Sequence, residues 1–300
     1  MNIKRIEAAA AFYAKKGNAA LDARLEFFED IWDIQARYAD QVAGETGYLP
    51  PSAAELQDCL LQGSCATHIA PISVSASLLG QAAAEIAAYC KEHGSFGEAQ
   101  VKSLDAADWS ALAAASPIDV AGANPEAYLE QFALRAEEQG IEDPAMVVMI
   151  FSLALRPMLD APAGKVAGLL KTGLVKALDA QGKSMHCPVC GGEPTASYVG
   201  RTAGNDGNAK LLWCGQCGTE WEFERVRCPY CGTHTQEKLH YLSVEGDDAH
   251  RAYCCDECGS YVRTVFVGEG SLAPFSFEVE DVVMADLDAA MLAKRNAQNN

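Results

Sequence analysis

Basic residues are scarce in this sequence. The chain has 23 lysines and arginines against 41 aspartates and glutamates, which gives a formal net charge of −18. A charge of this size favours solubility and repels other polyanions over most of the surface. The cysteine-rich segment, residues 184–270, is acidic as well, whereas a nucleic-acid-binding module is expected to present a basic face. We therefore expect no nucleic-acid partner.

Long hydrophobic runs are missing too. The longest strongly apolar run, residues 145–155, has 11 residues, whereas a helix needs roughly 20 to cross a bilayer. The apolar stretch near the start of the sequence, residues 8–14, stops at Lys15 and Lys16 and is too short for a signal peptide. These features predict a cytoplasmic protein without membrane insertion.

Several enzyme motifs are also absent. The sequence contains no phosphate-binding glycine loop, no nucleophile elbow and no HExxH pair. We therefore expect no catalytic residues and no organic-cofactor site, and we predict that the protein is not an enzyme.

Cysteines, in contrast, are plentiful and unevenly distributed. Of the 12 cysteines, Cys59, Cys65 and Cys90 are scattered through the first 180 residues, and all the others lie between residues 187 and 258. Thiols in a reducing cytoplasm seldom form a disulfide framework, so metal binding is the leading interpretation of the clustered cysteines.

The clustered cysteines form an internal repeat of CxxC units, here called knuckles. The units CPVCG and CGQCG are followed, 41 residues later in each case, by CPYCG and CDECG. The proline of the first knuckle and the glycine after each knuckle recur under the same shift, which predicts two equivalent units. The predicted metal ligands are Cys187, Cys190, Cys214, Cys217, Cys228, Cys231, Cys255 and Cys258.

The spacing of these cysteines suits tetrahedral metal coordination. A CxxC turn brings two thiolates within reach of one ion, and the following glycine lets the backbone turn toward the sulfur atoms. We expect two ions, iron or zinc, with ligands from both knuckles of one repeat, although the sequence also allows a crossed pairing of the adjacent knuckles 214–217 and 228–231. Closed four-thiolate sites leave no open position for hydrolysis, and both ions could simply stabilise a small core.

The remaining cysteines are weaker candidates. Cys254 is adjacent to Cys255 and does not fit the same knuckle, so we interpret it as a bystander. Cys59, Cys65 and His68 lack a fourth ligand and have apolar neighbours, which favours buried small residues over a metal site.

The first part of the chain is rich in helix signals. Residues 21–42 carry apolar side chains at helical spacing. Asn124 and Pro125 are a favourable cap and first-turn residue for a helix over residues 126–139, and Gly140 is a natural terminator.

The next helix is expected to begin at Asp143 and to run through residues 145–155. We predict a break at Arg156 and Pro157, because the residue before a proline avoids helical geometry. A further helix is expected over residues 166–178.

The pattern changes to β-branched and aromatic residues with glycine turns from Gly191 onward, and the chain ends in an amphipathic stretch, residues 282–295, that predicts a helix. The predicted strands cover residues 198–201, 210–213, 219–226, 237–244 and 260–267. The sequence therefore predicts an α+β protein with an all-helical N-terminal domain, two tandem four-cysteine modules and a C-terminal helix. The helical domain is expected over residues 1–182, and the first and second four-cysteine modules over residues 183–226 and 227–270. The C-terminal helix and tail are expected over residues 271–300.

The cysteine region resembles a known family. It contains CPVCGGEP, LLWCGQCGTEWEFERVRCPYCG and CCDECGSYVRTV, and in these segments it is similar to the formate dehydrogenase accessory protein FdhE family. The N-terminal stretch ARLEFFEDIWDIQARYAD, the ALRP segment and the closing DVVMADLDAAML follow the family order.

The resemblance implies a cytoplasmic maturation factor for formate dehydrogenase that binds the immature catalytic subunit, with rubredoxin-like modules that hold iron. The eight knuckle cysteines are the positions that match the family pattern. Two alternatives remain: a rubredoxin-like electron carrier, which predicts a reversible chromophore, and a zinc-ribbon adaptor that binds other proteins.

Overall fold

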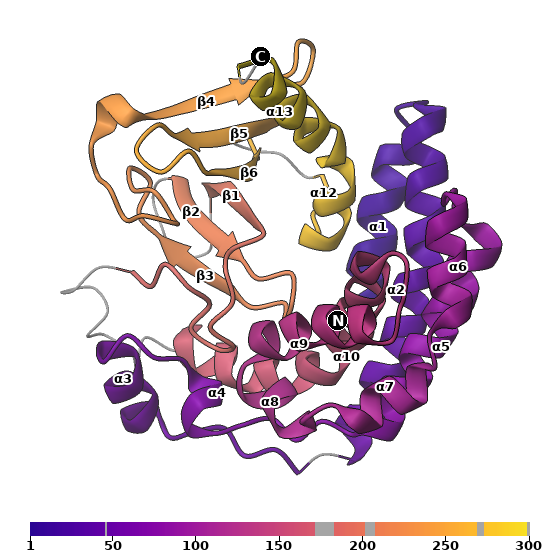
Figure 1. Cartoon of the computed structure of the whole chain (residues 1–300). Coiled ribbons are helices and arrows are strands. Elements are labelled where there is room, and N and C mark those ends of the chain that lie inside the picture. Colours follow the sequence, from indigo (N-terminus) through magenta and orange to yellow (C-terminus); the bar gives the residue numbers. More distant parts are fainter. Residues whose placement is uncertain (46, 172–182, 202–207, 269–272, 299–300) are drawn as a thin grey trace.

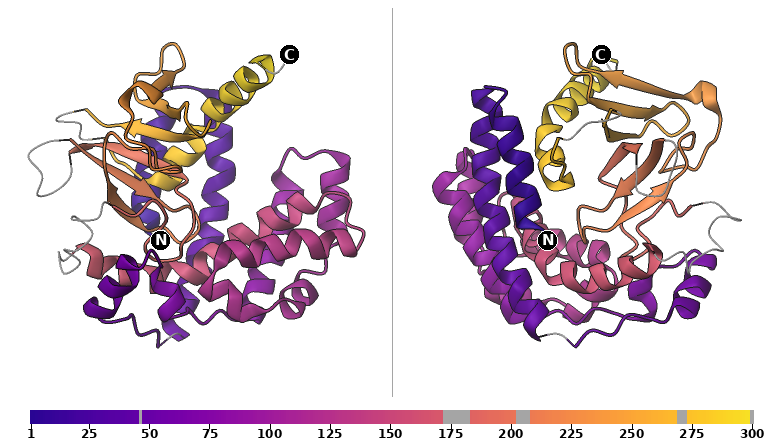
Figure 2. Two further views of the ribbon diagram at one scale, coloured as in Figure 1. Left: turned by 60° about the vertical axis from the view of Figure 1, so that its left-hand side comes forward. Right: turned by 180° about the vertical axis from the view of Figure 1, so that it is seen from behind.

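The computed structural model describes residues 1–45, 47–171, 183–201, 208–268 and 273–298. In this part of the chain a layer of helices lies beside a six-stranded sheet, and two C-terminal helices pack against both (Figures 1 and 2). The predicted α+β class is confirmed. The N-terminal helices are α1 (Ile3–Ala14), α2 (Ala19–Glu45), α3 (Ala53–Leu61), α4 (Ala66–Ile69), α5 (Ala76–His93), α6 (Glu98–Ala106), α7 (Trp109–Ala115), α8 (Ile118–Ala123), α9 (Pro125–Glu138) and α10 (Pro144–Lys171).

Local sequence signals determine several helix ends. The expected helix over residues 21–42 is α2, and the cap predicted for α9 forms because Asn124 Oδ1 accepts a hydrogen bond from the Ala127 amide. Gly140, with φ of +71°, follows α9 in the left-handed conformation that ends many helices. These predictions are confirmed.

The predicted break at Arg156 and Pro157 is wrong, because α10 continues through Pro157 and Pro162. A proline lacks the amide that would bond to the carbonyl four residues earlier. In α10 that carbonyl belongs to Leu153, and the buried Gln35 side chain of α2 donates to it at 2.8 Å. The tertiary contact thus satisfies the group that proline leaves unpaired.

As a result, α10 is far longer than its apolar run of 11 residues. Among the described helices it alone is long and apolar enough to cross a membrane. However, 56% of its most apolar 18-residue segment is buried inside the protein. The helix predicted over residues 166–178 is the end of α10 as far as Lys171, and its remainder lies outside the described residues.

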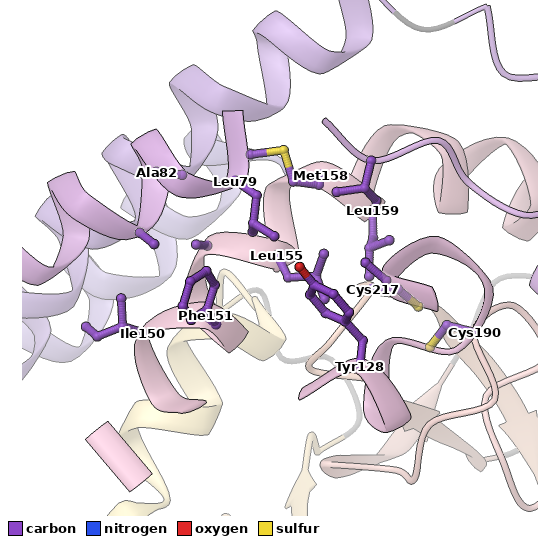
Figure 3. Packing of buried hydrophobic residues seen from close by; sticks show 14 of the residues in the cluster. Leu79, Ala82, Tyr128, Ile150, Phe151, Leu155, Met158, Leu159, Cys190 and Cys217 are labelled. Atoms are coloured by element: carbon purple, nitrogen blue, oxygen red, sulfur yellow. The ribbon is translucent and has the colours of Figure 1, made fainter. Parts of the chain in front are cut away.

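Residues of α5, α9 and α10 form the centre of the largest hydrophobic core. Phe132 and Phe151 stack with ring centroids 3.9 Å apart, and the edge of the Tyr128 ring meets Phe132. The core extends to Cys190 and Cys217 of the cysteine region (Figure 3). The first four-cysteine unit therefore shares a core with the helices.

The sheet is built from the two sequence repeats. Its strands are β1 (Ala196–Arg201), β2 (Asn208–Trp213), β3 (Glu220–Phe223), β4 (Leu239–Ser243), β5 (His250–Cys255) and β6 (Tyr261–Phe266), and a short 3₁₀ helix (Gln236–Lys238) precedes β4. Each repeat forms an antiparallel meander, and the two meanders join through the parallel pair β1 and β6, in which Ala196 lies opposite Arg263. The strand order is β3-β2-β1-β6-β5-β4.

Strand β5 was not expected, whereas the other five strands overlap predicted ones. Its sequence HRAYCC mixes charged residues with cysteines and shows no clean alternation. The shift of 41 residues was the available signal, because it maps β2 onto residues 249–254.

The expected C-terminal helix is two helices, α12 (Phe277–Val283) and α13 (Ala285–Gln298). Val279 and Val282 of α12 pack in a cluster with α1 and α2, whereas Leu287 of α13 packs on Ala252 of β5. The buried Met284 lies at the break. The change of direction lets one segment bury apolar residues against two different layers (Figure 1).

A buried polar network joins α1, β5 and α12. His250 donates from Nε2 to Glu280 at 2.8 Å and from Nδ1 to Asp247 at 2.7 Å, and the Tyr13 hydroxyl donates to Glu280 at 2.8 Å. Burial alone would lower the pKa of His250, but these two carboxylates raise it to about 9. The network therefore contains an imidazolium that ties the second meander to the helical layer.

Candidate metal centres

The knuckle cysteines meet within each repeat, and the crossed pairing does not occur. The sulfur atoms of each group of four lie within 4.8 Å of one another. In the first cluster, Cys187 lies 3.5 Å from Cys217 and Cys190 lies 3.5 Å from Cys214. In the second cluster the equivalent distances, Cys228 to Cys258 and Cys231 to Cys255, are both 3.7 Å.

These distances suit a shared ion better than a disulfide. A disulfide bond is about 2 Å long. Four thiolates placed about 2.3 Å from a tetrahedral zinc ion would be separated by about 3.8 Å. Both clusters are close to that spacing, so each could hold one zinc or iron ion.

The backbone of each knuckle follows the same pattern. In the first, the Gly191 amide donates to the Cys187 carbonyl at 2.9 Å, and the Cys187 amide donates to the Gly192 carbonyl at 2.8 Å. The glycine after each knuckle has φ between +72° and +80°. A residue with a side chain would be strained in this conformation, which explains the repeated glycine.

Local electrostatics differ among the thiols. Burial raises the pKa of the Cys187 thiol and raises that of Cys228 to about 12. At Cys258 burial acts in the same direction, but hydrogen bonds with Ser260, Cys231 and Cys228 together outweigh it and lower the pKa to about 7. Metal binding replaces the proton of a ligand thiol, so an ion would stabilise the thiolate form in these surroundings.

Buried cations next to the clusters were not foreseen. Arg156 of α10 lies against the knuckle glycine Gly218, and its Nη1 has no hydrogen-bond partner among the described residues. Lys210 of β2 is 1% exposed, and its Nζ lies 3.8 Å from the centre of the Tyr253 ring. Burial lowers the pKa of Lys210 to about 7. Four thiolates and a divalent ion carry a net charge of about −2, which Arg156 and the protonated form of Lys210 would offset.

No local signal in the sequence marks either cation. Arg156 comes from α10 of the helical layer, and Lys210 is a lysine within a strand that faces the other repeat.

None of the other cysteines in the described residues is a member of either cluster. Cys254 is buried in a small cluster with Ala252 and Leu287. Cys59 and Cys65 are buried, whereas His68 is exposed, and among the described residues these three do not form a group of metal ligands.

The site and the fold together define a class: an α+β protein whose sheet carries a tandem pair of four-cysteine units. The family model described as FdhE, central domain, matches residues 186–225, which contain the first four-cysteine cluster.

Curated relatives carry the same name. The chain is 29% identical over 151 residues to the FdhE homolog of Aquifex aeolicus, a match that covers 50% of this chain and 49% of that protein. It is 38% identical over 82 residues to FdhE of Escherichia coli O1:K1, which covers 27% of this chain and 25% of that protein. The matched segments thus span about half of the first relative and a quarter of the second.

The fold has a solved counterpart. The crystal structure of FdhE from Pseudomonas aeruginosa aligns with a TM-score of 0.53 and 18% identity, over 97% of this chain and 90% of that chain. The chain is thus similar to FdhE proteins in the cysteine region and shares their fold.

Proposed function

We propose that this chain is an accessory protein required for formate dehydrogenase activity, and that it binds the immature catalytic subunit through its metal-stabilised cysteine region. The observation that carries the proposal is the match of the FdhE central domain to residues 186–225. The matched residues contain the first four-cysteine cluster, which shares a core with the helical layer.

The eight knuckle cysteines would hold two ions, iron or zinc, in closed tetrahedral sites. Each ion would supply a cross-link between the two knuckles of its meander, and iron would add a one-electron couple. The protein itself would provide the surface that receives the client. A closed site has no open coordination position, which supports a role in assembly rather than catalysis.

An affinity pull-down from a formate-grown native lysate tests this function. The wild-type protein is compared with a Cys187→Ser, Cys228→Ser variant, and the bound metals are measured in parallel. Cys59→Ser, Cys254→Ser is the matched control, because both residues are buried cysteines outside the clusters. We expect the wild type and the control to recover the catalytic subunit and the knuckle variant to lose it.

Failure of the metal-loaded wild type to recover the catalytic subunit would contradict the accessory role. A second candidate function, electron transfer, is then favoured by the two exposed cysteines of the second cluster, Cys231 and Cys258. It predicts that the iron-loaded protein shows a visible absorbance that disappears on reduction and returns on oxidation.

A further inference from the structure

The two clusters have the same sequence pattern but opposite surroundings. We infer that the ion of the first cluster is a permanent part of the fold, whereas the second cluster is an exchange site that releases and takes up a thiophilic divalent ion through Cys231 and Cys258. The inference rests on the proposed metal binding and adds a division of labour between the two ions.

The first cluster is enclosed by the helical layer. Each of its four cysteines is at most 2% exposed. On the first knuckle, the amides of Ala66 and Thr67 donate to the carbonyls of Pro188 and Val189, both at 3.0 Å. An incoming ligand would have to break these contacts to reach the ion from this side.

The second knuckle of the first cluster is covered by α10. Ser152 donates from its hydroxyl to the Gln216 side chain at 3.2 Å, and the Arg156 guanidinium lies across Gly218. A cavity of about 310 Å³ borders Cys217, but this residue is only 2% exposed. The cavity therefore does not open a path to the sulfur atoms.

The second cluster is open on one side. Cys228 and Cys255 are buried, whereas Cys231 and Cys258 are exposed. Gly259, the equivalent of Gly218, has no atom within 4 Å of the position that a Cβ would take. Each knuckle of this cluster thus has one exposed cysteine.

This exposure allows exchange by ligand substitution. Donor atoms of a chelating acceptor, such as nitrogens or thiolates, replace the four thiolates one at a time, those of Cys231 and Cys258 first and those of Cys228 and Cys255 afterwards. Each released thiolate takes a proton from the buffer, and the ion leaves with its two positive charges on the acceptor. No electrons are transferred, and repetition of the step in reverse reloads the site.

The second meander has supports that do not depend on its ion. Strand β6 pairs with β1 from Ala196 to Val199, and His250 and Tyr13 both bond to Glu280. The knuckles of an emptied second cluster are therefore expected to remain close together. Loss of the first ion would instead disturb the main hydrophobic core.

The test is the release of zinc from the full-length protein loaded with two zinc ions per chain. The chelator 4-(2-pyridylazo)resorcinol reports free zinc by its colour. We expect one equivalent to leave rapidly and the second on the order of 100-fold more slowly, because the first site has to open locally before the chelator enters. Alkylation with iodoacetamide after the rapid phase, followed by peptide mass mapping, should mark Cys231 and Cys258 and leave the first cluster protected.

The matched variants are Cys231→Ser and Cys190→Ser, which occupy equivalent positions in the two repeats. Cys231→Ser should remove only the rapid phase and Cys190→Ser only the slow one. Release of both ions at one rate, or alkylation of the first cluster in the rapid phase, would overturn the inference. The two proposals can fail separately. A failed pull-down would contradict the accessory role, but the rapid and slow phases of zinc release would still be observed.

Discussion

Replacing Gly218 with alanine is expected to destabilise the protein by about 3 kcal/mol more than the same replacement at Gly259. These two glycines occupy the same place in the two repeats and have nearly the same backbone, with φ of +77° and +72°. Both variants therefore carry a similar cost of about 1 to 2 kcal/mol for an alanine in the left-handed region. The difference between the two losses of stability therefore measures how the atoms around each glycine accommodate the new methyl group.

The extra cost at Gly218 comes from Arg156. A Cβ at Gly218 would lie 2.2 Å from Nη1 and 2.4 Å from Nη2 of Arg156, closer than any real contact. Arg156 is 5% exposed and its guanidinium donates to Glu278 at 3.0 Å, so moving it separates a buried ion pair. Breaking such a pair costs about 3 to 5 kcal/mol, and the low end applies because Ser276 still donates to Glu278.

Urea unfolding of the two zinc-loaded variants, followed by circular dichroism and tryptophan fluorescence, measures the difference. Metal content is checked first, so that loss of an ion is not mistaken for loss of packing. In an Arg156→Ala background the two alanine variants should become equally unstable relative to their parent. Equal destabilisation in the presence of Arg156 would refute the reasoning.

Two further predictions concern buried polar groups. The pKa of His250 is raised to about 9 from an ordinary value of 6.5, so its contribution to the free energy of unfolding, roughly 3 kcal/mol, should be complete below about pH 6.5 and lost as the pH rises through 9. Urea unfolding at several pH values measures this loss, and a His250→Gln variant should not show it. Replacing Gln35 by leucine should cost about 1 to 3 kcal/mol, because the Leu153 carbonyl beside Pro157 is then left without its partner. Thermal unfolding of Gln35→Leu with no loss of stability would contradict this account of the uninterrupted helix.

The sequence predicted those features that depend on local spacing. The 41-residue shift placed all eight knuckle cysteines in two groups, and the structure brings the same groups together. The cap at Asn124 and the terminator Gly140 act on residues within one helical turn, so the neighbouring sequence was enough to predict them.

The features that escaped prediction depend on distant parts of the chain. The break expected at Pro157 fails because Gln35, on another helix, supplies the missing donor. The asymmetry of the clusters arises because α10 and residues 65–67 cover only the first one. Equivalent repeats in sequence thus acquire different environments from a layer that precedes them by many residues.

The central claim is that the eight cysteines bind two metal ions in closed four-sulfur sites. Metal analysis combined with X-ray absorption at the metal edge of the purified protein tests it most directly. The account predicts two ions per chain, each surrounded by four sulfur atoms, at about 2.3 Å if the metal is zinc. Fewer than two ions in the fully loaded protein, or nitrogen and oxygen atoms in the first coordination shell, would contradict it.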